Sequence, residues 1–170
     1  MSTEPLSWAD FVVAAQDFLR ISSRLNDGWE WLEAGERDGE SYLRKKERQL
    51  AVDSNPGSLT SWEYHVLYSP SYSCPVLYFN VHDQNGRFFG LDRIVRMLEF
   101  PSEIGLDNYL GVVSQTEHPI LRKPYCYLHP CRTGDLMATQ SKRSNVLISW
   151  LSCVAPVVRL DMSLEYAKPT

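Results

Sequence analysis

Apolar residues near the start of the chain recur three or four positions apart, with charged residues between them. The apolar positions in this stripe are Trp8, Phe11, Val12, Ala15, Phe18 and Leu19. This spacing predicts an amphipathic helix from residue 7 to residue 25. Ser7 is a suitable N-cap with Asp10 three positions later, and Asn26-Asp27-Gly28 is a favourable helix stop.

The residues after this helix form short apolar or alternating runs separated by turn signals, a pattern typical of strands. Strands are predicted over residues 29–33, 41–50, 62–68, 76–81 and 125–128, with a further short strand over 109–114. Residues 52–61 contain Asn55-Pro56-Gly57-Ser58 and are predicted to form a loop. Helical spacing returns over residues 91 to about 100 and over 145–154, and Pro156 is expected to end the last helix.

The predicted order is one helix, four strands able to pair as an antiparallel meander, a short helix, extra short strands and a C-terminal helix. Helices that flank a segregated set of strands indicate an α+β fold. The length of 170 residues favours a single domain spanning residues 1–170. Trp29 and Trp31 alternate with Glu30, so both indole rings should face the core.

Composition supports a globular fold, since 44% of residues are hydrophobic, 12% aromatic and 22% charged. The net charge of −4 gives no global field for binding nucleic acid. No run approaches the roughly 20 apolar residues of a membrane helix, and the first residues lack the pattern of a signal peptide. We therefore expect a cytoplasmic protein without stable membrane insertion, whose four unevenly spaced cysteines are reduced.

A cysteine follows the last predicted strand directly, in the tripeptide His129-Pro130-Cys131. Arg132-Thr133-Gly134-Asp135 comes next and indicates a turn. Cys131 is thus a candidate nucleophile at a strand end, with a histidine and a cation close by. The alternative is a small buried hydrophobic residue, which is the usual role of a free cysteine. The same packing role is expected of Cys74, Cys126 and Cys153, which lie in apolar surroundings.

Two other functions of these cysteines and histidines have weaker support in the sequence. A zinc site could be imagined from Cys126, His129, Cys131 and His118. Its ligand spacing lacks the usual paired cysteines, and a strand directs alternate side chains to opposite faces. A cysteine hydrolase would pair Cys131 with His65, His82 or His118, but the local signatures of cysteine proteases are absent.

Several stretches together resemble the autophagy E2-like conjugating enzymes, whose active-site motif is His-Pro-Cys. They are His129-Pro130-Cys131, residues 64–69 (YHVLYS), 75–79 (PVLYF), 115–121 (QTEHPIL), 149–152 (SWLS), 156–158 (PVV) and 164–168 (LEYAK). The similarity covers residues 60 to 170 and implies the E2-like, or UBC-like, fold. The branch of this family that carries a large acidic insertion fits less well, because this chain has no long acidic run.

The resemblance implies that Cys131 carries a ubiquitin-like protein as a glycyl thioester. The expected partners are an E1-like activating enzyme (autophagy protein seven), ubiquitin-like protein twelve, and autophagy protein five, which accepts the modifier on a lysine. No metal or organic cofactor is implied. The alternatives are an E2-like enzyme for the lipidated ubiquitin-like protein eight, and a module that binds ubiquitin-like proteins without covalent chemistry.

Ordinary ubiquitin E2 enzymes carry an asparagine after the His-Pro pair, where this chain has Cys131. Four residues are candidates to assist instead. The resemblance implies a tyrosine near the active site, and Tyr72 matches it; the alternative is a solvent-facing loop aromatic. Gln115 is a candidate oxyanion donor, with an ordinary polar residue at a strand end as the alternative. Thr133 could donate to the sulfur or the carbonyl, and His129 is favoured as a scaffold rather than a base.

A basic run, Arg44-Lys45-Lys46-Glu47-Arg48, lies on the second predicted strand. A solvated strand face is the favoured interpretation. The alternative is a docking surface for a protein partner, because an E2-like enzyme that works without a separate ligase must contact its acceptor directly.

Overall fold

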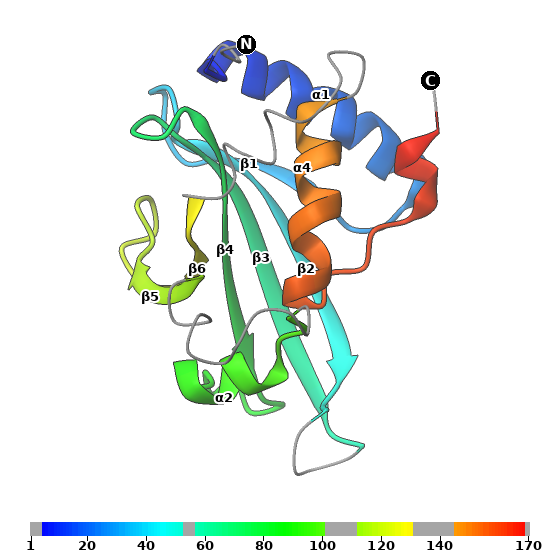
Figure 1. The fold of residues 1–170 in the computed structure, drawn as a ribbon, viewed down its shortest axis with the longest axis vertical. Helices are drawn as coiled ribbons and strands as arrows, with labels where there is room; N and C mark the ends of the chain where they lie inside the picture. Colours follow the sequence, from blue (N-terminus) through cyan, green and yellow to red (C-terminus); the bar gives the residue numbers. More distant parts are fainter. Residues whose placement is uncertain (1–4, 53–56, 101–111, 131–144, 169–170) are drawn as a thin grey trace.

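The computed structural model describes residues 5–52, 57–100, 112–130 and 145–168 (Figure 1). The helices are α1 (Trp8–Leu25), α2 (Leu91–Met97), α4 (Val146–Val154) and the 3-10 turns η3 (Ala155–Val158) and η4 (Leu164–Ala167). The strands are β1 (Glu30–Glu33), β2 (Ser41–Leu50), β3 (Leu59–Ser69), β4 (Cys74–His82), β5 (Val113–Glu117) and β6 (Pro124–Leu128). None of these helices is long and apolar enough to span a lipid bilayer, a finding limited to the described residues.

Helix α1 forms as the sequence pattern predicts. The Ser7 hydroxyl oxygen accepts from the backbone N–H of Asp10 at 3.1 Å, which caps the helix start. Asn26 ends the helix in the left-handed conformation, with φ of 52°. Phe11 and Phe18 lie on the face of α1 that is buried against the sheet.

The six strands form one antiparallel sheet in the order β1-β2-β3-β4-β6-β5. The predicted four-strand meander is confirmed as β1 to β4. The β5–β6 hairpin extends it, with β6 beside β4 and β5 at the outer edge. Together with the helices this confirms the α+β class.

Several predicted element boundaries are wrong, and three differ most from the structure. Strand β3 begins at Leu59 rather than residue 62, because Leu59 pairs with Leu50 at the end of β2. Helix α2 ends at Met97, where Leu98 turns to an extended conformation. The strand predicted over 109–114 lies instead at β5, since Glu117 pairs with Pro124 of β6; residues 109–111 lie outside the described part.

The sheet separates two apolar clusters of different size. Helices α1 and α4 cover one face, where the main core lies (Figure 1). Its largest fully buried side chains include Trp62, Tyr64, Phe79 and Trp150. The opposite face carries a smaller cluster, packed against the connection between β5 and β6; it comprises Tyr42, Leu67, Cys74, Val76, Tyr78 and Tyr125.

The two tryptophans at the start of β1 face the main core as predicted, with Trp29 buried and Trp31 half-buried. The basic run on β2 is not a uniformly solvated face. Lys45 is buried: its Nζ lies 3.3 Å from a carboxylate oxygen of Glu47 and 6.0 Å from the Trp29 ring centroid. The expectation was wrong here because strand alternation turns Lys45 toward the helices.

Side-chain hydrogen bonds hold the C-terminal elements on the sheet and α1. The Asn145 amide donates to the carbonyl oxygen of Ala14 at 2.8 Å, which joins α4 to α1. The hydroxyl of Tyr64 on β3 donates to the Val158 carbonyl at 2.9 Å. Tyr166 of η4 stacks on Phe18, with ring centroids 4.7 Å apart. These contacts hold α4, η3 and η4 on the helix-covered face of the sheet.

Candidate active site

Strand β6 leads directly into the His129-Pro130 part of the predicted motif. The backbone N–H of His129 donates to the carbonyl oxygen of Val112 at 2.8 Å, which extends the β5–β6 pairing beyond the last strand residue. The approach to the motif is therefore held by strand-type bonding as far as His129. Cys131 and Thr133 lie outside the described residues.

The pairing of β6 with β4 sets the direction in which the motif is entered. Tyr127 lies opposite Tyr78, and the two strands are antiparallel. Going forward along β6 therefore means going back along β4, toward the β3–β4 turn at residues 70–73. Tyr72 lies in this turn, and 60% of its surface is exposed. Strand β6 thus runs toward the end of the sheet that holds Tyr72.

Gln115 lies further from that end. It sits opposite Cys126 on the outer strand β5, and its side chain is exposed. Among the described residues, no hydrogen bond joins any two of Tyr72, Gln115 and His129. The structure places Tyr72 and His129 toward the same end of the sheet and Gln115 partway along its edge.

The half-buried His129 ring packs against Tyr127 in an edge-on arrangement, with the ring centroids 5.4 Å apart. Pro130 is buried. Packing of this kind orients the segment that leads into the motif.

Two of the cysteines expected to be packing residues are buried. Burial raises the pKa of Cys74 to about 11 and that of Cys126 to about 12, so both stay thiols near neutral pH. The expectation for Cys153 was wrong, because its position on α4 is exposed. Helix α4 is apolar around most of its circumference, and the sequence pattern therefore did not reveal which face is outward.

Residues 10–165 match the protein family described as autophagocytosis associated protein, active-site domain. The chain belongs to this family. It is 32% identical over 205 residues to the ubiquitin-like-conjugating enzyme ATG10 of Homo sapiens, covering 91% of this chain and 89% of the human protein. It is 35% identical over 117 residues to the enzyme of the same name from Arabidopsis thaliana, covering 61% of this chain and 51% of the relative. Identity to that of Dictyostelium discoideum is 29% over 130 residues, or 63% and 54% of the two chains.

Family membership confirms that the chain is an E2-like transferase of autophagy, with the expected E2-like α+β fold. The names of the relatives also confirm the branch of the family that the lack of an acidic insertion favoured.

Sequence reasoning missed a chain of buried polar side chains on the second face of the sheet. Nδ1 of His65 on β3 lies 3.0 Å from Nε2 of His118, which follows β5. Nε2 of His65 lies 2.9 Å from a carboxylate oxygen of Glu63. Both imidazoles are 0% exposed. Glu63 and His65 are two positions apart on one strand, which indicates that their side chains share a face. Nothing in the local sequence indicated that His118 joins them.

His65 and His118 lie on the second face of the sheet, and this position argues against the zinc-site and cysteine-hydrolase hypotheses. Cys126 belongs to the main core, whereas His118 packs among the rings of the opposite face. The zinc set that combined them is therefore wrong as a group. His65 and His118 bond to each other, which leaves neither ring free to act as an exposed base.

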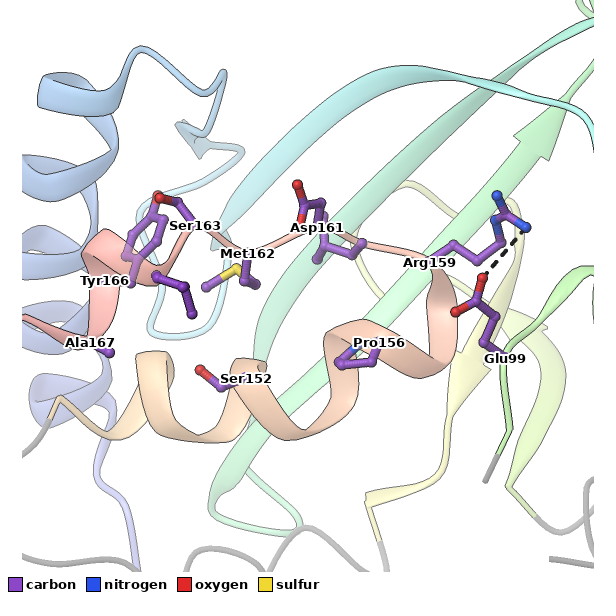
Figure 2. A pocket seen from close by; sticks show the side chains of 11 residues that line it. Glu99, Ser152, Pro156, Arg159, Asp161, Met162, Ser163, Tyr166 and Ala167 are labelled. Carbon is purple, nitrogen blue, oxygen red and sulfur yellow. Dashed lines mark ion pairs between the residues drawn. The ribbon is translucent and has the colours of Figure 1, made fainter. Parts of the chain in front are cut away.

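A separate pocket of about 460 Å³ lies on the helix side, between η3 and the chain that leads to η4 (Figure 2). Figure 2 shows an ion pair at one end, where Arg159 lies 3.7 Å from Glu99. Met162 and Tyr166 contribute to its lining. None of the described site residues, Tyr72, Gln115 or His129, lines this pocket.

Proposed function

We propose that this enzyme accepts autophagy ubiquitin-like protein twelve from its E1-like activating enzyme, autophagy protein seven, as a thioester on Cys131. It then transfers the modifier to a lysine of autophagy protein five. The observation that carries this proposal is the similarity to the human conjugating enzyme over 91% of the chain, together with the His129-Pro130-Cys131 motif.

In the loading step the Cys131 thiol gives its proton to solvent, and the thiolate attacks the glycyl carbonyl held on the E1 cysteine. A new carbon–sulfur bond forms, the bond to the E1 sulfur breaks, and the E1 cysteine leaves as a thiolate. Exchange of one thioester for another is close to thermoneutral, so positioning is the main contribution of the enzyme. ATP is consumed by the E1, and this step needs no cofactor.

In the transfer step a neutral lysine amine attacks the same carbonyl. The carbon–sulfur bond to Cys131 breaks, the thiolate leaves, and the nitrogen loses a proton to solvent as the isopeptide bond forms. The direction of β6 supports Tyr72 as a helper, because this strand leads toward the turn that holds the Tyr72 ring. Gln115 and Thr133 are proposed as donors to the carbonyl oxygen, and His129 as a scaffold.

The proposal is tested by incubating the chain with the E1, ATP and ubiquitin-like protein twelve or eight. The expected result is an adduct with protein twelve that thiol reagents cleave. Cys131→Ser should give a thiol-resistant ester or no adduct. Loading by protein eight instead would favour the lipidating alternative, and non-covalent binding without any adduct would favour the binding module. Addition of protein five should then consume the protein twelve adduct and yield a thiol-resistant conjugate.

A further inference from the structure

The β5–β6 hairpin, which leads into the active-site motif, is joined to the rest of the sheet by a short ladder. Strand β6 pairs with β4 through two opposed residue pairs, Tyr78 with Tyr127 and Phe79 with Cys126. The neighbouring ladder between β3 and β4 runs from Ser61 to Ser69. Few backbone bonds therefore fix the hairpin, so side chains must supply much of its attachment.

His118 is one side chain placed to do so. Its backbone N–H donates to the Lys123 carbonyl at 2.8 Å, and its carbonyl accepts from the Arg122 N–H at 2.9 Å, which closes the turn of the hairpin. The imidazole is fully buried against the sheet, with its centroid 5.0 Å from that of Tyr78 and 4.9 Å from that of Tyr125.

The hydrogen bonds of the two rings fix their tautomers. Nδ1 of His118 faces the backbone N–H groups of Ile120 and Leu121 at 3.2 and 3.1 Å, so it accepts and carries no proton. The proton of neutral His118 therefore sits on Nε2 and is donated to Nδ1 of His65. His65 then carries its own proton on Nε2 and donates it to Glu63. Each ring nitrogen of His65 and His118 therefore has one defined role, as donor or as acceptor.

The resulting polar chain spans the sheet. It begins in the hairpin turn, passes over β4 and reaches β3 at His65 and Glu63. It continues to β2, where Nζ of Lys46 lies 3.5 Å from the second carboxylate oxygen of Glu63. A buried polar network with all members satisfied favours one arrangement of the elements that it joins.

We propose that His118 is a positioning residue of the transfer reaction: its hydrogen bond to His65 sets where the β5–β6 hairpin lies on the sheet, and hence where the segment carrying Cys131 leaves β6. This inference rests on the proposed function. Displacement of reacting groups by about 1 Å can slow a reaction by ~100-fold, so a hairpin that is folded but shifted would be a poor enzyme.

The charges around His118 favour the neutral ring. Glu63 on β3 lies beside His65 and is already paired with His65 and Lys46. Arg44 on β2 is paired with Glu30 of β1 at 2.6 Å. Three tyrosines of β2, β4 and β6 also pack on the ring, and burial raises their pKa values so that they stay neutral; they are Tyr42, Tyr78 and Tyr125. Within the turn, Glu117 and Arg122 pair with each other. A proton on Nδ1 of His118 would oppose the two N–H groups that point at it.

Two substitutions separate the bond to His65 from the bonds within the turn. In His118→Gln, the amide nitrogen takes the place of Nε2 and can still donate to His65. In His118→Asn, the amide oxygen takes the place of Nδ1 and can still accept from Ile120 and Leu121, but the bond to His65 is lost. A role confined to the turn would make the Asn variant the better enzyme; the proposed positioning role would make the Gln variant the better one.

The test uses the full chain, loaded by its E1 with the ubiquitin-like protein, and measures single-turnover discharge of the thioester at saturating acceptor. The discharge rate of His118→Asn should be lower than that of the wild type by ~10-fold or more. The rate of His118→Gln should lie within ~3-fold of the wild-type rate. Ile21→Ala, in α1 and remote from the hairpin, is the control for loss of stability. It should discharge at nearly the wild-type rate even where its melting temperature matches that of His118→Asn.

Wild-type discharge by His118→Asn, or a loss no larger than that of a stability-matched Ile21→Ala, would overturn the proposal. If the His118 variants fail to fold, His65 provides the reciprocal pair. His65→Asn keeps an acceptor toward His118 and should stay active, whereas His65→Gln loses it and should be slow; the reverse order would also overturn the proposal. Failure of the proposed function is distinct, because the wild type itself would then form no thioester.

Discussion

His118 donates a hydrogen bond from Nε2 to Nδ1 of His65 across 3.0 Å, and neither ring is exposed to solvent. The bond joins residues 53 positions apart in the sequence, one in the hairpin turn and one on the central strand β3. Burial of the His118 ring makes the stability of the fold depend on pH.

Stability should fall as the pH is lowered from about 6.5 to 4. Burial is the main reason that the pKa of His118 drops from its ordinary 6.5 to about 4, and the nearby His65 adds to it. Between these values the unfolded chain binds a proton that the folded chain does not, so stability rises with pH. The shift corresponds to about 3 kcal/mol, present in full above pH 6.5 and absent below pH 4.

Urea unfolding at a series of pH values measures this effect, with His118→Gln as the reference because it lacks the titrating ring. The difference in free energy of unfolding between the two proteins should change across pH 4 to 6.5. Parallel curves over this range would show that His118 titrates normally. Glu63 adds a loss in the same direction at lower pH: burial alone would raise its pKa, but the hydrogen bond from His65 and the charge of Lys46 outweigh burial and lower it.

Alkylation should distinguish the described cysteines by burial. Iodoacetamide at pH 8 is expected to label Cys153 in the native chain, because this thiol is exposed. Cys74 and Cys126 should react only after unfolding, since burial both shields them and raises their pKa values to about 11 and 12. Peptide mass spectrometry reports each site separately. Native labelling of Cys126 at the rate of Cys153 would contradict the described packing of β6.

The capping residue of α4 should contribute measurably to stability. Oδ1 of Asn145 accepts from the N–H groups of Leu147 and Ile148 at 2.9 and 3.2 Å, and its amide group donates to Ala14. Asn145→Ala removes both functions and should cost about 1–2 kcal/mol in denaturant unfolding. Asn145→Asp keeps the cap but loses the donor to α1, so its loss should be smaller. Equal losses would show that the cap adds nothing beyond the bond to Ala14.

Tyr72 should affect activity without affecting stability. Its side chain is largely exposed in the β3–β4 turn, so Tyr72→Phe should change the free energy of unfolding by less than about 0.5 kcal/mol. If the hydroxyl assists the reaction, single-turnover discharge should slow by ~10-fold or more. In that case Tyr72→Ala should slow discharge only slightly more than Tyr72→Phe does. A Phe variant as fast as the wild type, with a slow Ala variant, would assign the role to the ring instead.

Elements whose signals are local could be predicted from the sequence. Helix α1 and strand β2 follow from a helical stripe with its cap and from an extended run between turns. The start of β3 could not be placed, because turn residues 57–58 immediately precede it and its first residues are extended through pairing with β2. The exposure of Cys153 depends on which face of an almost wholly apolar helix meets the sheet, which is a tertiary property.

The candidate site likewise has one part that the sequence predicts and another that depends on the tertiary structure. The motif around Cys131 is contiguous and can be recognised in one sequence. The placement of Tyr72 beyond the end of β6 depends on strand order, since β6 lies beside β4 rather than following it along the chain. The bond between His65 and His118 needs the hairpin to fold back over β4, and no spacing rule anticipates it.

The central claim, that Cys131 carries the ubiquitin-like protein, is tested most directly by finding which residue bears the glycyl group after loading. The adduct formed with E1 and ATP would be isolated at low pH, digested and sequenced by mass spectrometry, with Cys153→Ser as the control for the exposed thiol. The account predicts modification at Cys131 in both proteins and none in Cys131→Ala. Modification at Cys153 or another residue, or an adduct that persists in Cys131→Ala, would contradict it.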